Sequence, residues 1–508
     1  EEGKLWYTEP LNLDAFDRLH PRATESHGGL VSPSGFWGMS FIYGLIGGLT
    51  AVSIMHALTA LIAIIASFLF KSTITKIFDE KIAWLSWILL LTHPAWWYYA
   101  TRGWHHNILF VSLLIIVLYG LIVRPFTNNA SHSPNAGFMM DKVMIASAAA
   151  FAIFVRPSAI LWLIPMLAIL AYTSPRRTKK VIITAIITSL VAAAVLWMVN
   201  ANVFGSLSHL RAGSSVAGID ASFITQIFPD GYNIKTVARS IGYYFFIKIW
   251  WFSIPLLIAL STFIPKHKKI FKQLFKKAGH GFGERRNLSD SPFAFGRRSQ
   301  KPQKDNLLKD AYLLVFAGVS AVLLLWYGSW NIMDNPDPSN ITLANSYMRY
   351  WLPAFVLSIP FVAMGIQMIA KKMNHAKALA GLVVLMIGAS GYTVASGNDG
   401  VINNISQLNT NHEISQKVNG IIPAQSIIIT NRHDKLFFPD HKILFPIDDP
   451  GTFETIRALK RTSPMFVYNL KFSDDELKGY NGVLKQISLR LQPLQEFGNE
   501  QLYRITSI

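Results

Sequence analysis

The chain has 508 residues, of which 51% are hydrophobic, 13% aromatic and only 15% charged, and its mean hydropathy is +0.32. Soluble domains carry about 25% charged residues, so this composition predicts a membrane protein. The chain has no cysteine, which excludes a disulfide framework, a thiolate metal site and a cysteine nucleophile. The net charge of +18 does not require nucleic acid as a partner, because membrane lipids with anionic headgroups attract lysines beside transmembrane helices.

Residues 1–35 are polar and are interrupted by proline and glycine. The chain starts with Glu1, and neither a signal peptide nor a first apolar helix is visible. We therefore expect an upstream transmembrane helix and interpret residues 1–35 as the first outer loop. For any one ionisable residue of this loop, a solvated ion pair within the loop explains it as well as a functional role does. These residues are Glu9, Asp14, Asp17, Arg18, His20, Arg22, Glu25 and His27.

Residues 36–398 contain apolar runs long enough to cross about 30 Å of hydrocarbon. The clear runs are 49–70, 83–99, 106–123, 181–199, 241–264, 311–330, 349–370 and 377–396. Two others are irregular, because 36–48 is too short to cross alone and 143–172 is too long for one helix. Arg156-Pro157 interrupts the long run, since proline disfavours helical geometry in the residue before it. The sequence thus predicts a transmembrane domain of about nine or ten helices.

Lysine and arginine gather in the connections on one face of this domain, which the positive-inside rule makes cytoplasmic. The connections carry Lys71, Lys76, Lys81, Arg176, Arg177, Lys179, Lys180, Lys371, Lys372 and Lys377. The dense basic segment 266–309 falls on the same face, where a solvated loop that fixes topology is favoured over a docking site for a partner. The first loop, the turn at Arg102, the loops 200–240 and 331–348, and the C-terminal region then face outward.

Residues 399–508 change to a globular pattern, which predicts a small C-terminal α/β domain on the extracytoplasmic face. We expect strands at 426–430, 442–446, 465–468 and 502–505, and helices at 411–420, after Pro450 and from Asp474. The domain has no glycine-rich phosphate loop and no metal-ligand spacing. Its other polar candidates lack a fixed spacing, so loop positions explain them better than a site does: His433, Asp434, His441, Asp448 and Asp449.

Ionisable groups at the outer ends of membrane spans are the best site candidates, because a buried charge costs several kcal/mol unless it is paired or used. Beyond the first loop, the candidate substrate-binding residues are Arg102, His105, His106, Arg211, Lys248, Arg349 and Tyr350. An aromatic belt at headgroup level explains the nearby tyrosines and tryptophans but not Arg102, His105 and His106. A lipid phosphate or pyrophosphate is their natural counter-charge.

Several motifs together resemble the GT-C membrane glycosyltransferases, nearest to the branch of protein O-mannosyltransferases and aminoarabinose transferases. They are the acidic first loop, Pro33-Ser34-Gly35-Phe36-Trp37-Gly38, the Arg102 turn, the Arg156-Pro157 break, and Arg349-Tyr350-Trp351-Leu352-Pro353. The resemblance implies a polytopic helical fold in the cell membrane. It also implies transfer of a sugar from a polyprenyl-phosphate donor to a glycan, lipid or protein acceptor on the outer face.

The resemblance further implies that Asp14 or Asp17 acts as general base or metal contact, and that Arg102 and Arg349 hold the donor phosphate. The chain departs from the family pattern, because His105, His106 and Asn107 stand where an acidic residue often follows this arginine. The usual Asp-Glu pair at the end of the first helix is not visible either. The need for a divalent metal ion therefore stays open.

Between the two acids of the first loop, Asp14 is the preferred base. We expect Leu13 and Phe16 to seat the segment against the membrane surface, while the two carboxylates share one side of a helical turn. Such a pair could raise the pKa of one carboxyl and leave the other ionised. The alternative is that both acids pair with Arg18 and Arg22 in a solvated helix, which stabilises by only tenths of a kcal/mol.

Two other functions stay open at this point. Broken helices and intramembrane cations such as Arg156 and Lys248 would suit a lipid or solute transporter or flippase. The lost acidic position would suit a non-catalytic membrane subunit of a larger assembly. No inverted repeat is evident in the sequence to favour the transporter.

Overall fold

The computed structural model describes most of the chain in nine continuous stretches. These are residues 7–33, 37–103, 105–123, 136–156, 232–278, 301–330, 342–373, 376–397 and 399–508, with scattered helical positions between 183 and 198. The chain divides into two compact units. Unit 1 combines Glu1–Ala51, Ala193–Ile219 and Ile402–Ile508, and unit 2 combines Val52–Ala192 and Asp220–Val401.

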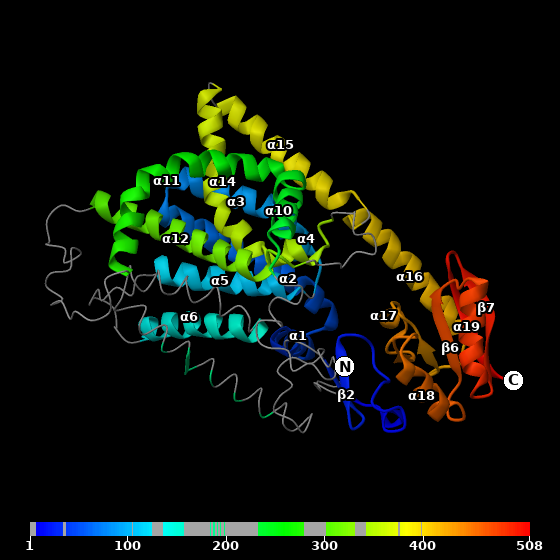
Figure 1. Ribbon diagram of the computed structural model, residues 1–508. Coiled ribbons are helices and arrows are strands. Elements are labelled where there is room, and N and C mark those ends of the chain that lie inside the picture. The colour runs from blue at the N-terminus through cyan, green and yellow to red at the C-terminus, as the bar shows by residue number, and fades with distance from the viewer. Residues whose placement is uncertain are drawn as a thin grey trace. The chain divides into compact units, whose positions relative to one another are not determined.

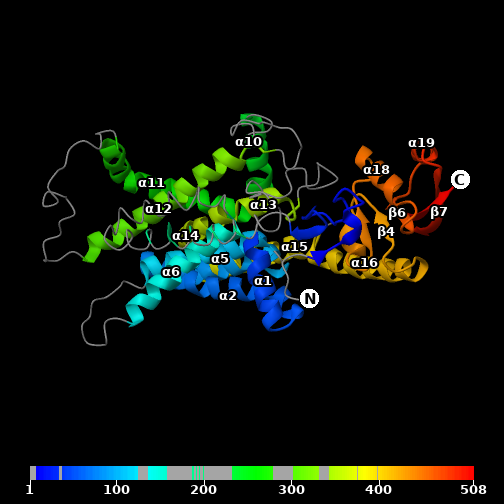
Figure 2. The same ribbon diagram turned by 90° about the horizontal axis from the view of Figure 1, so that it is seen from below.

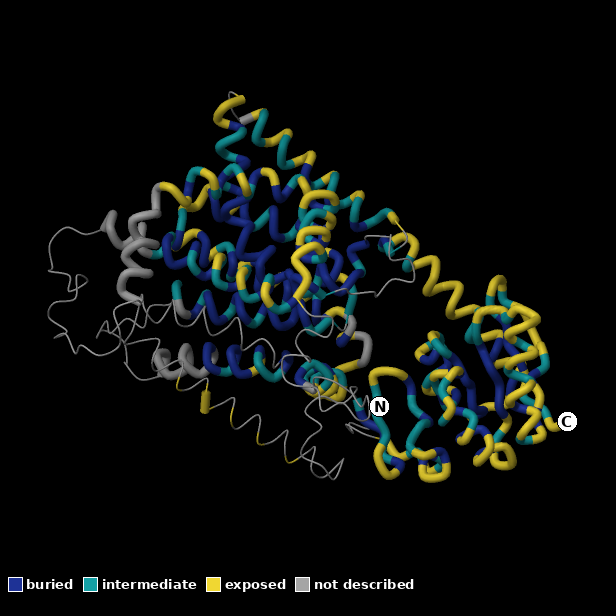
Figure 3. The backbone as a smooth tube through the Cα atoms, in the orientation of Figure 1, coloured by how far each residue is buried: buried dark blue, intermediate teal, exposed yellow. Residues whose placement is uncertain are grey.

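Unit 2 is helical (Figure 1). Its described helices are α2 Val52–Ile77, α3 Glu80–Thr92, α4 Pro94–Thr101, α5 His106–Ile122, α6 Ala136–Val155, α10 Ile234–Ile241, the π-helix Gly242–Ile247, α11 Trp250–Ala278, α12 Lys301–Tyr327, α13 Ser346–Tyr350, α14 Leu352–Lys372 and α15 Ala376–Ala395. Helix α14 packs against α3, α11, α12 and α15 and is the most buried of the long apolar helices (Figure 3). A Cβ atom at Gly365 would collide with the carbonyl of Pro255, so α11 and α14 approach closely there.

Four described helices are long and apolar enough to cross a membrane: Ala57–Ile77, Leu308–Tyr327, Leu352–Lys372 and Lys377–Ala395. Two bent pairs raise the number to six if each pair is one span. They are Pro94–Thr101 with His106–Gly120, bent by 113°, and Ile234–Ile247 with Trp250–Pro265, bent by 102°. These helices confirm the predicted class of helical multi-span protein. The predicted span 181–199 lies outside the continuously described residues.

Prolines decide where several helices of unit 2 end. The prediction of one uninterrupted span at 83–99 is wrong, because α3 ends at Thr92 and α4 begins at Pro94 after the extended residue His93. Proline at the second helix removes the amide that would continue the first. Helix α6 ends at Val155, which confirms that a helix stops at the predicted Arg156-Pro157 break. Pro157 and the predicted second helix lie outside the described residues. The helices therefore break at His93 and directly before Arg156.

Unit 1 contains a five-stranded sheet with the strand order β5-β4-β6-β8-β7. Strand β4 Ile427–Ile429 pairs in parallel with β5 Lys442–Leu444 and β6 Met465–Leu470, while β8 Glu500–Ser507 pairs antiparallel with β6 and with β7 Leu489–Phe497. Side chains alternate along β4, so Ile428 enters one hydrophobic core and Ile427 and Ile429 enter the other. The sheet therefore has two covered faces.

Helices cover these two faces of the sheet. Helix α16 Val401–Ile421 contributes to the core that contains Ile428, whereas α18 Pro450–Leu459 and α19 Asp474–Lys485 contribute to the other. Figure 2 shows α16 and α18 on opposite sides of the strands. The short helix α17 Asp434–Phe437 connects β4 to β5 in the chain. The predicted C-terminal α/β domain is confirmed.

Strand β7 was not predicted from the sequence. It contains Pro493, and the pairing with β8 shifts between Pro493 and Gln495. Proline removes a backbone donor and argues against a strand, but β7 lies at the edge of the sheet, where that donor is not needed.

The N-terminal segment is part of the same compact unit as the C-terminal residues. It forms a small sheet with the strand order β1 Tyr7–Thr8, β3 Leu30–Pro33 and β2 Thr24–His27, and a 3-10 turn at Pro10–Asn12 lies between β1 and β2 in the chain. Ala15 and Leu19 enter the core under α18 and α19, and Leu19 forms a β-bridge with Leu444. Helix α1 Trp37–Leu49 follows in the same unit. The sequence did not indicate that this loop packs on the C-terminal domain.

Candidate functional site

Arg102 follows the last residue of α4 and points its guanidinium at an aromatic ring. Its central carbon lies 4.2 Å from the centre of the Tyr98 ring, a cation–π geometry. Its Nη2 also donates to the backbone carbonyl of Asp399, at 3.3 Å. Neither contact brings a negative charge to the guanidinium.

Arg349 lies in the short helix α13, which Asn345 caps by accepting a hydrogen bond from the Tyr347 amide. The Arg349 guanidinium lies 5.4 Å from the centre of the Tyr350 ring. Its Nε is buried and has no hydrogen-bond partner among the described residues. A ligand that accepts a hydrogen bond could satisfy this donor.

Tyr99 connects the turn at Arg102 to the start of α13. Its hydroxyl donates to the carbonyls of Leu343, at 2.5 Å, and Asn345, at 3.1 Å. The Tyr99 ring also contacts His105 edge-on, with the ring centres 5.0 Å apart. His105 lies within electrostatic range of both Arg102 and Arg349. The structure therefore brings together two of the predicted arginines and a predicted histidine from segments more than two hundred residues apart.

Arg156 is a further member of this cluster, and it was not among the predicted site residues. It follows α6 and is 3% exposed. It donates to Asn107 Oδ1 and, at 2.9 Å, to the hydroxyl of Tyr327. Its guanidinium lies 4.9 Å from the centre of the Tyr350 ring, and Tyr350 stacks on Tyr327 at 4.6 Å. The sequence analysis interpreted Arg156 as a helix break and as an intramembrane cation that would suit a transporter. A cation directly before a helix-ending proline is the signal that could have added it to the site residues.

The other predicted substrate-binding residues are His106, Lys248 and Arg211. His106 starts α5 and lies within electrostatic range of Arg156 and Arg349. Lys248 follows the π-helix and lies within range of Asp399, whose backbone carbonyl accepts from Arg102. Arg211 lies outside the described residues. We name Arg102, Arg156, Arg349, His105, His106 and Tyr350 the cation cluster.

The cation cluster carries positive charge next to aromatic surface. Within the part of the chain that the structure describes, neither Arg102 nor Arg349 forms an ion pair with a carboxylate. Guanidinium groups in such surroundings match the geometry of a phosphate oxyanion. Among the described residues, no group of three or more histidine, aspartate and glutamate side chains is placed to hold a metal ion.

Asp17 lies in unit 1 and holds the backbone of a turn. Its Oδ1 accepts from Ser26 Oγ and the Gly29 amide, and its Oδ2 from the Gly28 amide, each at 2.8 Å. Burial acts to raise the pKa of Asp17, but the hydrogen bonds from Gly29, Ser26 and Gly28 outweigh it and hold the pKa below its usual value. Both carboxylate oxygens are therefore occupied.

Asp14 is exposed and lies three residues before Asp17. The expected helical turn is not formed, because Phe16 and Asp17 adopt left-handed backbone angles, with φ of 54° and 58°. The alternative that both acids pair with Arg18 and Arg22 is also wrong. Arg18 pairs with Asp449 at 2.8 Å, and Arg22 with Asp434 at 2.5 Å.

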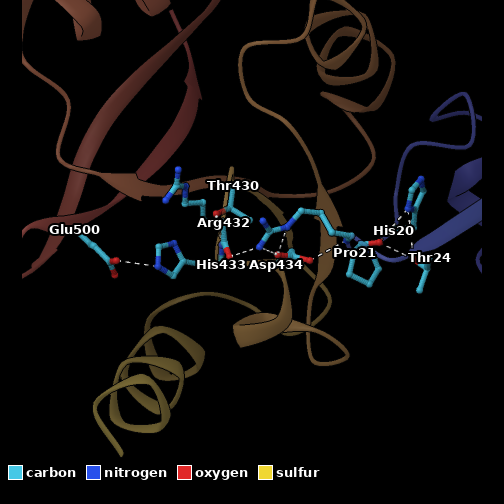
Figure 4. Close-up of polar contacts among 9 residues, drawn as sticks. His20, Pro21, Thr24, Thr430, Arg432, His433, Asp434 and Glu500 are labelled. Atoms are coloured by element: carbon cyan, nitrogen blue, oxygen red, sulfur yellow. Dashed lines mark hydrogen bonds and ion pairs between the residues drawn. The ribbon is translucent and has the colours of Figure 1, made fainter. Parts of the chain in front are cut away.

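The polar residues of the C-terminal loops stabilise the fold of unit 1. Figure 4 shows Asp434 beside Pro21 of the N-terminal segment and His433 next to Glu500, with which it pairs at 2.8 Å. The second oxygen of Glu500 accepts from the Tyr468 hydroxyl at 2.5 Å. Asp449 caps α18 by accepting from the Gly451 amide. The structure thus gives the predicted loop residues roles in capping and pairing.

Residues 36–207 match the family model described as the Alg9-like mannosyltransferase family. This match confirms the resemblance to GT-C membrane glycosyltransferases and supports a glycosyltransferase. No curated protein matches the chain at the sequence level.

Solved structures similar to the chain include ArnT from Cupriavidus metallidurans in the apo state, at 13% identity and a TM-score of 0.43, over 92% of this chain and 88% of that one. The same protein bound to undecaprenyl phosphate matches at 14% identity and a TM-score of 0.42, over 92% and 87%. The apo oligosaccharyltransferase of Archaeoglobus fulgidus matches at 10% identity and a TM-score of 0.43, over 90% of this chain and 63% of that one.

Proposed function

We propose that the chain is a glycosyltransferase of the cell membrane, which moves a sugar from a polyprenyl-phosphate carrier to a glycan, lipid or protein acceptor on the outer face. The observation that carries this proposal is the cation cluster. Arg102 and Arg349 lie beside aromatic rings without a carboxylate partner in the described residues, and the Nε of Arg349 is a buried donor without a partner. An anionic ligand would satisfy both the charge and the donor.

A phosphate is the anion that fits best. Two guanidinium groups can each donate two parallel hydrogen bonds to phosphate oxygens, and the tyrosine faces beside them suit the apolar chain or sugar that a lipid-linked phosphate carries. The family match over residues 36–207 supports a sugar as the transferred group.

The reaction needs charge stabilisation and proton removal. The acceptor oxygen or nitrogen attacks the anomeric carbon of the sugar as the bond from that carbon to the phosphate oxygen breaks. The electron pair of the broken bond stays on the carrier phosphate, whose extra negative charge Arg102 and Arg349 stabilise. The acceptor proton passes to a general base.

We propose Asp14 as this base in preference to Asp17. Asp17 uses both carboxylate oxygens to hold the turn, whereas Asp14 is exposed. A base must reach the acceptor proton, so an exposed carboxylate is the better candidate. Lys248 and Tyr350 complete the proposed donor site, and Arg211 stays a prediction from sequence.

The test of the donor site is direct binding of polyprenyl phosphate to the purified protein. We expect Arg102→Met and Arg349→Met each to weaken this binding by about tenfold or more, because each removes charge-assisted hydrogen bonds to the phosphate. Lys235→Met removes an equal charge from the exposed face of α10 and serves as the control. Wild-type affinity in folded Arg102 and Arg349 variants would reject the donor site.

The outer-face orientation has its own test, which the absence of native cysteine makes simple. Ser463→Cys lies in unit 1 and Ser289→Cys in the basic segment 266–309. We expect an impermeant thiol reagent to label position 463 on intact cells and position 289 only after permeabilisation. Labelling of both positions from one side would contradict the orientation.

A further inference from the structure

The first-loop turn, which we define as residues 12–19, is closed at its base by a buried side chain. Asn12 is 0% exposed. Its Oδ1 accepts from the Leu19 amide at 2.6 Å, and its Nδ2 donates to the Leu19 carbonyl at 3.1 Å and to Ser26 Oγ at 2.9 Å. The ends of the turn are therefore held together by a single asparagine.

Burial sorts the residues of the turn into two sets. Ala15 and Leu19 are 0% and 1% exposed, because they enter the core formed with β5, α18 and α19. Leu13 and Phe16 are 67% and 62% exposed, and Asp14 is exposed between them. The C-terminal core thus determines which residues of the turn face out.

An ion pair connects the same turn to α18. Arg18 Nη1 donates to Asp449 Oδ2 at 2.8 Å, and Asp449 also caps α18 through the Gly451 amide at 2.9 Å. A Cβ atom at Gly451 would collide with the Arg18 guanidinium, so the guanidinium lies directly against the first turn of α18. Arg18 is four positions from Asp14 within the turn.

We propose that residues 402–508 act as a positioning domain for the first-loop turn, with Arg18 and Asp449 as positioning residues for Asp14. This inference rests on the proposed function, in which Asp14 is the general base. Misplacing a catalytic group by about 1 Å can cost up to a hundredfold in rate, so a modest loosening of the turn has a measurable effect.

The first experiment measures the mobility of the first-loop turn and does not depend on enzyme activity. A spin label on Leu13→Cys in the full-length chain reports the mobility of the turn, and the native chain has no competing cysteine. We expect Asp449→Asn to increase the label's mobility, because asparagine still caps α18 but loses the charge that holds Arg18. Gly451→Ala should have the same effect by displacing the guanidinium. Glu496→Gln, which removes the exposed pair with Lys471 elsewhere in the domain, is the control.

The second experiment measures turnover. Asp449→Asn and Arg18→Gln should lower kcat by about tenfold and leave the KM for the lipid donor unchanged, while Arg18→Lys retains most of kcat. In an Asp14→Asn background, Asp449→Asn should have no further effect on kcat, because its effect acts through Asp14.

The outcomes separate the two proposals. Unchanged label mobility in Asp449→Asn overturns the positioning role, and so does a fall in kcat that is equal with and without Asp14. Unchanged kcat in a variant whose label is more mobile overturns it as well. Normal turnover of Asp14→Asn alone overturns the assignment of the base, whatever the label shows.

Discussion

Two arginines of each compact unit have opposite surroundings. In unit 1, Arg18 and Arg22 each pair with an aspartate from a distant part of the chain. In unit 2, Arg102 and Arg349 lie against tyrosine rings and have no ion pair among the described residues. Each unit contains a loop or turn that is rich in charged residues, so charge density alone does not distinguish the arginines of unit 1 from those of unit 2.

The difference teaches how to separate structural from ligand-binding cations. A cation that a carboxylate already neutralises contributes to the fold and has little capacity left for a ligand. A cation that the fold holds beside aromatic surface without an anion is a candidate for binding one from outside. The three predictions below test this difference through stability.

Removing the buried partner in unit 1 should have the largest effect. Asp434 has a side chain that is 0% exposed and accepts from the Nε, Nη2 and backbone amide of Arg22. We expect Asp434→Ala to lower the free energy of unfolding of unit 1 by about 2 kcal/mol or more, since it removes charge-assisted hydrogen bonds in a buried position. Hydrogen exchange of the β5 amides in denaturant measures the change. Asp475→Asn, in an exposed pair with Lys478, is the control and should change nothing.

The ion pairs of unit 1 show which features of the fold could not be predicted from the sequence. Local patterns are enough to predict β4 from its run of isoleucines and α18 from the proline at its start. They do not reveal that Arg18 pairs with a residue 431 positions away, because a pair of opposite charges has no sequence signature. The sequence therefore left solvated ion pairs and a functional role equally open for the first loop, and it did not indicate that Ala15 and Leu19 belong to the core of the C-terminal domain.

The sequence predicts those residues of the candidate site that lie at the ends of apolar helices. Arg102 and Arg349 both stand at the edge of an apolar run, which is readable from one sequence. That they share a cluster depends on the hydrogen bonds of Tyr99 to Leu343 and Asn345, which are tertiary contacts. Arg156 was missed as a site residue for the same reason, since only the fold brings it beside Tyr350.

A second prediction concerns pH and has a smaller expected effect. The hydrogen bond from Arg18, and then that from the Gly451 amide, hold the pKa of Asp449 below its usual value. The unfolded chain then takes up the proton first as pH falls, so this stabilisation is complete above the usual pKa of about 3.9 and is lost as pH falls through the lower folded value. Because the pair is about one-third exposed, the loss should be a few tenths of a kcal/mol.

This pH effect is measured as the slope of the unfolding free energy of unit 1 below pH 4. Asp449→Asn should reduce that slope, because it removes the titrating group. Arg349→Met in unit 2 should leave the slope unchanged. An equal slope in wild type and Asp449→Asn would show that the Arg18 pair does not contribute to acid sensitivity.

The smallest expected change in stability is that of Arg349→Met, and it should be zero or favourable. The wild-type protein without ligand carries a buried Nε that lacks a hydrogen-bond partner in the described residues, and a methionine of similar length removes this cost while keeping contact with the ring of Tyr350. We expect the thermal unfolding temperature of the variant to equal or exceed that of the wild type in detergent. Adding polyprenyl phosphate should raise the unfolding temperature of the wild type but not that of the variant, because a ligand stabilises only the state that binds it. A variant that unfolds well below the wild type without ligand would assign Arg349 to the fold, like Arg22, and would remove the contrast between the two units.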